Sequence, residues 1–345
     1  MKAINKSIIV IISLFFISCA TEDNDIEVAK ENPTVESVDI LDLVKWQKIA
    51  DTPVTNFQAH IVHENKLFSL SIKDTYVFDF ELVQWTLLAT DSDNVFPDYG
   101  LGGLKVNFIR NEKWNMFTEK GLYEFDFQLN KWSVVKEFPQ VNGLFSISGF
   151  YVEEDMAIYF LDKSNGNDTI YKYDLFTNEL LSHSNYINTG DRGETYNGSL
   201  KVENSNYYIT PGSGTGRSNE ILISKFNEDF TTLVPVGNFV TENDMANSVA
   251  VQYGNYIIFG LGGTATLDGS TGIITDIRPT LKFYAYDTVN DVFTEMSSPF
   301  YESCWAANVI VHNNEYYLIN GHTIKNQKVE LRTKIEKIEF DFITQ

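Results

Sequence analysis

An aromatic residue followed by Asp or Asn recurs six times along the chain, at intervals of 47 to 60 residues. The six pairs are Phe78-Asp79, Phe125-Asp126, Tyr173-Asp174, Phe226-Asn227, Tyr286-Asp287 and Phe340-Asp341. A period near 50 residues indicates a fold assembled from copies of one supersecondary unit that share a common core. A single repeat domain is therefore expected, although a chain of 345 residues would otherwise suggest two domains.

Two further positions keep the same phase. Six residues after the Asp or Asn, five units carry a large apolar residue: Trp85, Trp132, Leu180, Leu233 and Phe293. Three residues before it, four units carry a tyrosine: Tyr76, Tyr123, Tyr171 and Tyr284. Because Asp and Asn side chains can bond the backbone two residues on and start a turn, each unit is expected to contain a strand, a tight turn and an antiparallel strand.

Two more strand-like runs precede each of these pairs. In the fifth unit they are Ser248–Gln252 and Tyr256–Gly260, which are joined by the turn-forming stretch Tyr253–Asn255. Each unit thus carries four antiparallel strands, which make one propeller blade. The sequence predicts an all-β, six-bladed β-propeller over residues 42–345.

These repeats resemble the kelch family over nearly all of the chain that follows the N-terminal region. The fifth unit matches best, with Gly262-Gly263 after its second strand and Tyr286-Asp287 at the end of its third. The other units lack the double glycine at that point, so the motifs are degenerate. The resemblance implies a kelch-type propeller.

The sixth unit lacks room for its fourth strand, because the sequence ends at Gln345, four residues after Asp341. The segment Lys45–Ile49 near the start reads as such a strand, with Trp46 in the place of Trp85 and Trp132. We therefore predict that Lys45–Ile49 pairs with the C-terminal strand and closes the ring. Closure would remove a sheet edge that is otherwise open to aggregation.

The N-terminal region predicts where the protein is located in the cell. Residues 1–18 combine Lys2 and Lys6 with an apolar run that is too short to span a bilayer, as in a signal peptide. Cys19 directly after a small residue resembles the lipobox of bacterial lipoproteins, which implies lipidation at Cys19. Residues 19–41 read as an acidic, flexible tether. Within it, Thr21–Asp25 resembles the surface-export signal of Bacteroidetes lipoproteins. We expect a protein anchored by lipid in the outer membrane, facing the periplasm or the cell surface.

The net charge and the cysteine content disfavour nucleic acid as a partner and a disulfide within the chain. The formal net charge of −21 disfavours nucleic acid, because an acidic surface repels phosphate backbones. The chain has two cysteines. If Cys19 is lipidated, Cys304 has no disulfide partner, and we expect it to be a buried thiol.

The expected binding site lies where the loops into each first strand and the loops between second and third strands gather on one face of the ring. Three arginines in these loops suit a carboxylate or sulfate, and three aromatic residues suit sugar rings. The ligand-binding candidates are Arg192, Glu194, Tyr196, Arg217, Glu242, Asn247, Arg278, Tyr301 and Trp305. A plainer interpretation is that these side chains pair with nearby acids on solvated loops.

No motif predicts a metal site, a cofactor or a catalytic residue. His60 and His63 lie three apart on a predicted strand, so their side chains point to opposite faces. Residues 162–168 lack the ligand spacing of an EF-hand loop, and Gly212–Gly216 lacks the Gly-Lys-Ser/Thr ending of a phosphate-binding loop. The chain also lacks the paired histidines that a kelch copper-radical oxidase would need beside Cys304.

Three functions remain open at this stage. The first is a cell-envelope lipoprotein that binds a glycan or a protein partner through the propeller loops. The second is a sugar mutarotase resembling the kelch enzymes that interconvert sialic acid anomers, with Arg217 or Arg192 beside Glu194 or Glu242. The third is a structural subunit of an outer-membrane complex.

Overall fold

The computed structural model describes residues 39–344 apart from 91–94, 97–104, 139–145, 163–168, 186–194, 197, 212–218, 243–244, 246–247, 268–273, 281, 297–303, 305 and 326–327. The signal peptide and most of the tether predicted for residues 1–41 therefore lie outside the described residues. The first described strand begins at Asp39, three residues before the predicted start of the propeller. No helix occurs in the described part of the chain, so none of it offers a helix long and apolar enough to cross a membrane.

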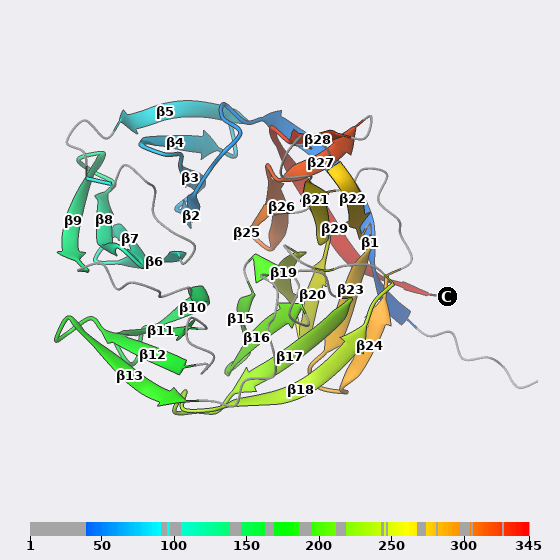
Figure 1. Cartoon of the computed structure of the whole chain (residues 1–345). Coiled ribbons are helices and arrows are strands. Elements are labelled where there is room, and N and C mark those ends of the chain that lie inside the picture. Colours follow the sequence, from blue (N-terminus) through cyan, green and yellow to red (C-terminus); the bar gives the residue numbers. More distant parts are fainter. Residues whose placement is uncertain are drawn as a thin grey trace, which may run out of the picture. The chain divides into compact units, whose positions relative to one another are not determined.

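The described strands form a ring of six four-stranded antiparallel blades (Figure 1), which confirms the predicted fold. The first blade contains β2 (Ala59–His63), β3 (Lys66–Leu70), β4 (Asp74–Asp79) and β5 (Gln84–Thr90). The second contains β6 (Lys105–Arg110), β7 (Lys113–Thr118), β8 (Gly121–Asp126) and β9 (Lys131–Glu137). The third contains β10 (Ser146–Val152), β11 (Ala157–Asp162), β12 (Thr169–Asp174) and β13 (Glu179–Asn185).

The second half of the ring follows the same order, from an inner first strand to an outer fourth strand. The fourth blade contains β15 (Ser199–Val202), β16 (Ser205–Pro211), β17 (Glu220–Phe226) and β18 (Leu233–Val240). The fifth contains β19 (Ser248–Tyr253), β20 (Tyr256–Gly260), β23 (Phe283–Asp287) and β24 (Val292–Glu295). The sixth contains β25 (Asn308–His312), β26 (Glu315–Ile319), β29 (Lys334–Thr344) and β1 (Asp39–Asp51).

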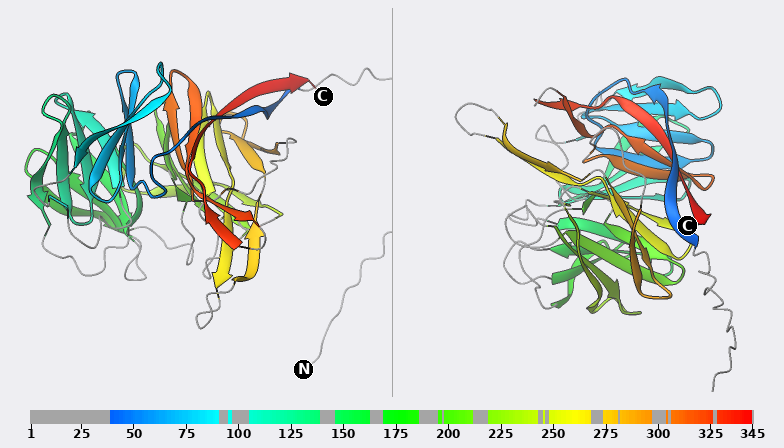
Figure 2. Two further views of the ribbon diagram at one scale, coloured as in Figure 1. Left: turned by 90° about the horizontal axis from the view of Figure 1, so that it is seen from above. Right: turned by 90° about the vertical axis from the view of Figure 1, so that its right-hand side faces the viewer.

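Antiparallel order gives the ring two different faces. We call the turn face the one that carries the tight turns between the first and second strands and between the third and fourth. The loop face carries the connections between second and third strands and those from one blade to the next. Two hairpins that the sequence did not predict as strands lie in loop-face connections: β21 (Gly263–Leu267) with β22 (Ile274–Pro279), and β27 (His322–Lys325) with β28 (Lys328–Leu331). Figure 2 shows both hairpins projecting from that face.

The repeated Asp starts the turn as expected in the first, second, third and fifth blades, where it accepts from the backbone N–H groups two and three residues on. Asp126 Oδ1 accepts hydrogen bonds from the backbone N–H groups of Gln128 and Leu129, both at 2.9 Å. Asp174 does the same with Phe176 and Thr177, at 2.8 and 2.9 Å. These bonds favour the charged carboxylate, with the bond from Leu129 as the largest cause at Asp126, and they lower the pKa of both residues.

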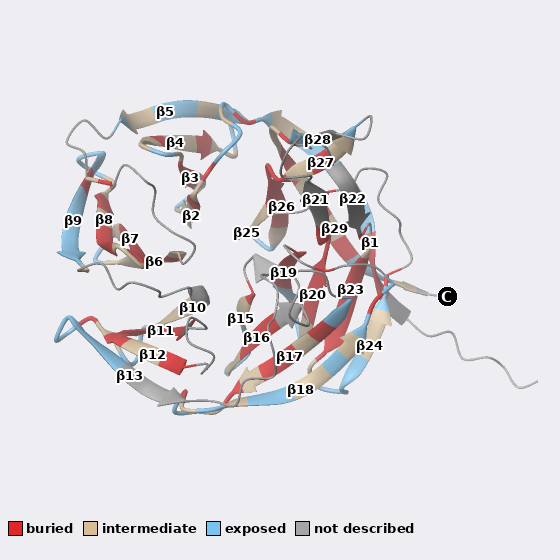
Figure 3. Cartoon of the chain, in the orientation of Figure 1, coloured by how far each residue is buried: buried red, intermediate tan, exposed pale blue. Residues whose placement is uncertain are grey.

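The apolar residue six positions later packs between blades. Trp132 lies opposite Phe125 across β8 and β9, and Trp85 lies opposite Phe78 across β4 and β5. The Trp132 ring meets Trp114 edge-on at 4.8 Å, and its Nε1 donates a buried hydrogen bond of 2.8 Å to Thr75 Oγ1 of the first blade. The same position therefore serves both as a cross-strand partner and as a link to the neighbouring blade. Figure 3 shows the buried residues concentrated in the middle strands of the blades, whereas the outer strands β5, β9, β18 and β24 are largely exposed or half-buried.

The N-terminal strand closes the ring as predicted. β1 pairs with β29 along its whole length, from Asp39 opposite Thr344 to Asp51 opposite Lys334. The predicted position of Trp46 was wrong by three residues. Leu43 lies buried opposite Phe340, as Trp85 lies opposite Phe78 in the first blade. Trp46 instead lies opposite Ile338, and its ring is 5.8 Å from the guanidinium of Arg332.

A buried polar network lies next to this closure. Arg332 and Glu336 are 3% and 4% exposed, and Arg332 Nη2 donates to Glu336 Oε2. Arg332 Nη1 donates to the sulfur of Cys304 at 2.6 Å, so Cys304 is buried as expected. Asn320 accepts a hydrogen bond of 2.6 Å from Thr52 Oγ1 and also accepts, through its backbone carbonyl, from Arg332. These contacts tie the segment after β1 to the loop-face connection of the sixth blade.

Candidate functional site

Most of the predicted ligand-binding residues are not among those that the structure describes. Arg192, Glu194, Arg217, Asn247, Tyr301, Trp305 and the predicted lipidation site Cys19 lie outside the described residues. Their roles stay predictions.

Three of the predicted residues fall on described backbone. Glu242 is exposed and forms an ion pair with Lys282 at 3.6 Å, and Lys282 also bonds Glu295. The hydrogen bond that Lys282 donates to Glu295 is the main cause that raises the pKa of Lys282. Arg278 lies in β22 rather than in an irregular loop, opposite Thr264 of β21. Glu242 and Arg278 thus belong to the two loop-face connections of the fifth blade.

Tyr196 lies in a strand that the sequence did not predict. This strand, β14 (Thr195–Tyr196), adds in parallel to the inner edge of β19, with Thr195 opposite Ser248 and Tyr196 opposite Val249. It also approaches β10 and β16. β14 therefore occupies the inner edge of β19 at its loop-face end. Two residues without alternating hydrophobicity carry no strand signal, so the sequence alone predicts a loop at this point.

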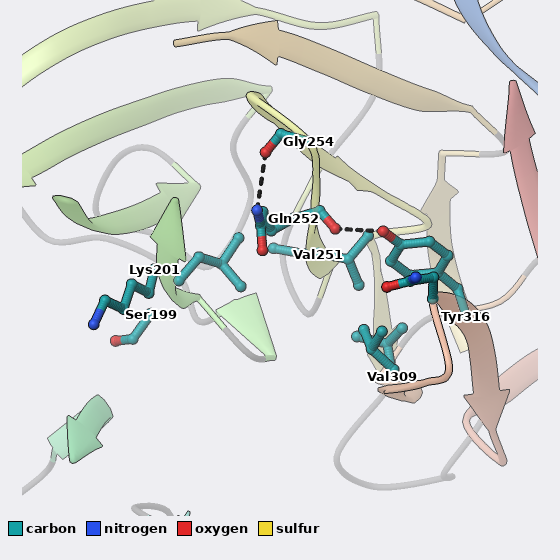
Figure 4. Close-up of a pocket in the computed structure, with 11 residues that line it drawn as sticks. Ser199, Lys201, Val251, Gln252, Gly254, Val309 and Tyr316 are labelled. Carbon is teal, nitrogen blue, oxygen red and sulfur yellow. Dashed lines mark hydrogen bonds between the residues drawn. The ribbon is translucent and has the colours of Figure 1, made fainter. Parts of the chain in front are cut away.

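The other end of these inner strands is hollow. A pocket of about 370 Å³ lies on the turn-face half of the inner strands of the fourth, fifth and sixth blades (Figure 4). We call it the turn-face pocket. Its lining consists of Ser199, Leu200 and Lys201 from β15, Ala250, Val251, Gln252 and Gly254 from β19 and its turn, and Val309, Val311, Asn314 and Tyr316 from β25, its turn and β26. The volume falls within the range of about 300–1,000 Å³ that is typical of ligand sites.

Two hydrogen bonds hold the wall of this pocket in place. Tyr316 donates its hydroxyl to the backbone carbonyl of Gln252 at 2.6 Å, and Gln252 Nε2 donates to the carbonyl of Gly254 at 2.9 Å. Burial raises the pKa of Tyr316 to about 12, so its hydroxyl keeps its proton at neutral pH and remains a donor. The bond joins the fifth blade to the sixth across the pocket.

Lys201 is the one charged residue among the described residues that line the turn-face pocket. Its side chain is exposed, and it makes no ion pair within 4.0 Å with any residue that the structure describes. It also borders a second pocket of about 270 Å³ that contains Glu153 and Glu154. The turn-face pocket itself is lined by no carboxylate and no histidine among its described residues. It can therefore donate and accept hydrogen bonds and hold a negative charge, but the described lining has no acid–base pair.

A third pocket, of about 330 Å³, lies between the first two blades and includes His63 and Phe127. These rings stack at 4.2 Å, and His312 stacks on Phe80 at the same distance one blade earlier. The repetition indicates a packing device between blades. His60 turns the other way, toward Phe57, and burial lowers the pKa of His60 to about 3. The two histidines thus point to opposite faces, as predicted, and in the described part of the chain no three His, Cys, Asp or Glu residues are grouped to hold a metal ion.

Comparison with known proteins identifies the fold alone. No protein-family model matches the sequence, and no curated protein matches it. Many solved structures match in three dimensions. One of them, the structure of YjhT, superimposes with a TM-score of 0.55 and 12% sequence identity, and the match covers 85% of this chain and 99% of that one. At this identity the likeness supports a kelch-like propeller and no particular activity.

Proposed function

We propose that this protein is a binding module of the cell envelope, held on the outer membrane by a lipid on Cys19, which takes a glycan or protein partner on the propeller. One observation carries the binding role. The turn-face pocket offers a cation, amides and strand edges on a rigid ring, while its described lining lacks an acid–base pair. Such a lining is suited to hold a ligand rather than to transform it.

The mutarotase alternative has less support among the described residues. Of the four side chains it would use, the structure describes Glu242, and that carboxylate is paired with Lys282. Likeness to YjhT at 12% identity adds the fold and nothing about chemistry. Sugars are included among the ligands to be screened for binding. An anomer-exchange assay on any sugar that binds would then reveal a mutarotase activity.

A thermal-shift screen tests the binding role. The chain from residue 20 to 345 is melted with polysaccharides, sialic acids, other acidic sugars and soluble envelope proteins. A partner that binds only the folded state stabilises it by about 2.7 kcal/mol at one hundred times its Kd, which is readily measured. Lys201→Glu should abolish the shift, whereas Lys66→Glu, an exposed lysine in the third pocket, should leave it intact. If no glycan or protein produces a shift, the role of a structural subunit is favoured instead.

Attachment to the membrane through Cys19 is tested separately. Cys19→Ser should release the chain from the membrane fraction and prevent incorporation of radiolabelled fatty acid. A Cys19→Ser chain that still sediments with outer membranes would contradict the lipid anchor.

A further inference from the structure

Backbone groups of the inner strands face the turn-face pocket. In an antiparallel ladder, alternate residues turn their N–H and C=O toward one neighbour and then away from it. β19 and β20 are joined by the two-residue turn Gly254–Asn255, so Tyr253 and Val251 bond to β20, whereas Gln252 and Ala250 point their backbone groups to the opposite edge. The bond from Tyr316 to the Gln252 carbonyl agrees with this alternation.

The neighbouring inner strands repeat the arrangement. Val202 and Ser205 flank the turn after β15, so Lys201 turns its backbone groups to the free edge. His312 and Glu315 flank the turn after β25, so Val311 does the same. The pocket is thus bordered by three strand edges whose members line it. Unpaired strand edges are templates for an added strand.

This chain already uses one of these edges. β14 adds to β19 in parallel and stops at Tyr196 opposite Val249. The next residues of β19, Ala250 to Gln252, lie beyond the end of β14 and line the turn-face pocket. The edge of β19 is therefore compatible with strand addition along its first two residues. Along the next three, no described strand pairs with it, and the Gln252 carbonyl accepts the hydrogen bond from Tyr316.

The lining favours a peptide over a sugar. Sugar rings are commonly held by stacking on an open aromatic face, and Tyr316, the one aromatic residue among the described lining residues, is 7% exposed. Val309, which is half-buried, and Val311, which is exposed, instead offer small apolar surfaces between the strand edges. Alternating amides beside small apolar side chains match the period of an extended peptide.

We propose that the turn-face pocket binds an extended peptide segment of a partner protein, which adds as a strand to the free edge of β19 and places a carboxylate against Lys201. This inference rests on the proposed binding function and specifies its partner as a polypeptide. The main-chain bonds supply affinity that does not depend on sequence, and Lys201 with the valines supplies the selection.

A displayed library of random peptides, selected on the chain from residue 20 to 345, tests this directly. Gln252→Pro removes the N–H that the added strand would use, and β19 does not need that N–H to bond β20. Gln252→Ala is its matched control, because it removes the same side chain and keeps the N–H. We expect selected peptides to be rich in Asp or Glu, and to bind Gln252→Pro at least about tenfold more weakly than they bind the Gln252→Ala control. Lys201→Glu should weaken binding by a similar factor without changing the fold.

Thiol protection locates the bound peptide. In a Val311→Cys chain from residue 20, the introduced thiol lies in the pocket, and Cys304 is fully buried. Bound peptide should slow alkylation of the thiol at 311 in proportion to occupancy. Peptides that bind without protecting it, or that bind Gln252→Pro and Lys201→Glu unchanged, would overturn the proposed site. A glycan that protects the thiol while no peptide does so would overturn the partner class and leave the binding function in place.

Discussion

Replacing Glu336 with Gln should destabilise the propeller strongly, because it leaves the Arg332 guanidinium buried without its counter-charge. Both residues are nearly inaccessible, at 3% and 4% exposed. Breaking a buried ion pair by removing one partner costs about 3–5 kcal/mol. At about 2.1 cal/mol/K of unfolding entropy per residue, a propeller of about 300 residues has an unfolding entropy near 0.6 kcal/mol/K. Glu336→Gln should therefore lower the Tm by about 5–8 °C.

An exposed ion pair between β1 and β29 offers a matched control. Lys45 and Glu339 form an ion pair at 2.9 Å between β1 and β29, but their side chains are 49% and 33% exposed. Exposed pairs contribute about 0–1 kcal/mol, so Glu339→Gln should lower the Tm by less than about 2 °C. Calorimetry of both variants checks the contrast. If Glu336→Gln melts within about 2 °C of the parent chain, the buried network does not stabilise the closed ring.

Three other predictions follow from the fold. A chain that starts at Ala50 loses most of β1 and should melt far below a chain that starts at Asp39, as judged by circular dichroism; equal melting would contradict ring closure by β1. Gly262→Ala should destabilise more than Gly254→Ala in thermal denaturation, because a Cβ at 262 would lie 2.5 Å from backbone, whereas one at 254 has open space and a strained φ of +54°. The lowered pKa of the turn aspartates means that the unfolded chain binds more protons, so their stabilisation is present above pH 3.8, the ordinary value, and lost as pH falls below it. Melts from pH 7 to pH 3 should therefore show a shallower decline for Asp126→Ala than for the parent chain.

The propeller could be predicted from the repeat, because the repeated residues themselves form the turns and the packing contacts of each blade. Asp126 and Asp174 start turns through hydrogen bonds to their own following backbone, and Trp132 fills the space between blades. Spacing along the sequence is enough to reveal such local roles. The missing fourth strand of the last blade also left a visible gap, which pointed to β1.

The details that escaped prediction depend on contacts between distant segments. The register that places Leu43, not Trp46, opposite Phe340 is set by pairing across the whole chain. β14 is defined by its partner β19 and has no periodic pattern of its own. The buried pair of Arg332 and Glu336 likewise reads as ordinary surface charge in the sequence.

The turn-face pocket was missed for the same reason. Lys201, Gln252 and Tyr316 come from three blades and share no motif, so no spacing in the sequence connects them. Glycines, arginines and aromatic residues gather instead in the long connections of the loop face, and these favoured a site on that face. An alternation of free backbone groups along an inner strand could have been inferred once the blade was recognised, because it follows from the position of the tight turn.

Amide hydrogen exchange measured by NMR tests the open edge of β19 most directly. In the free protein the Val251 amide, which bonds β20, should exchange slowly, and the Gln252 amide, which faces the pocket, should exchange much faster. Adding a selected peptide should slow the Gln252 amide and leave the outer strands unchanged. A Gln252 amide that is already protected in the free protein, or protection by peptide that appears only in loop-face segments, would contradict a binding site on this edge.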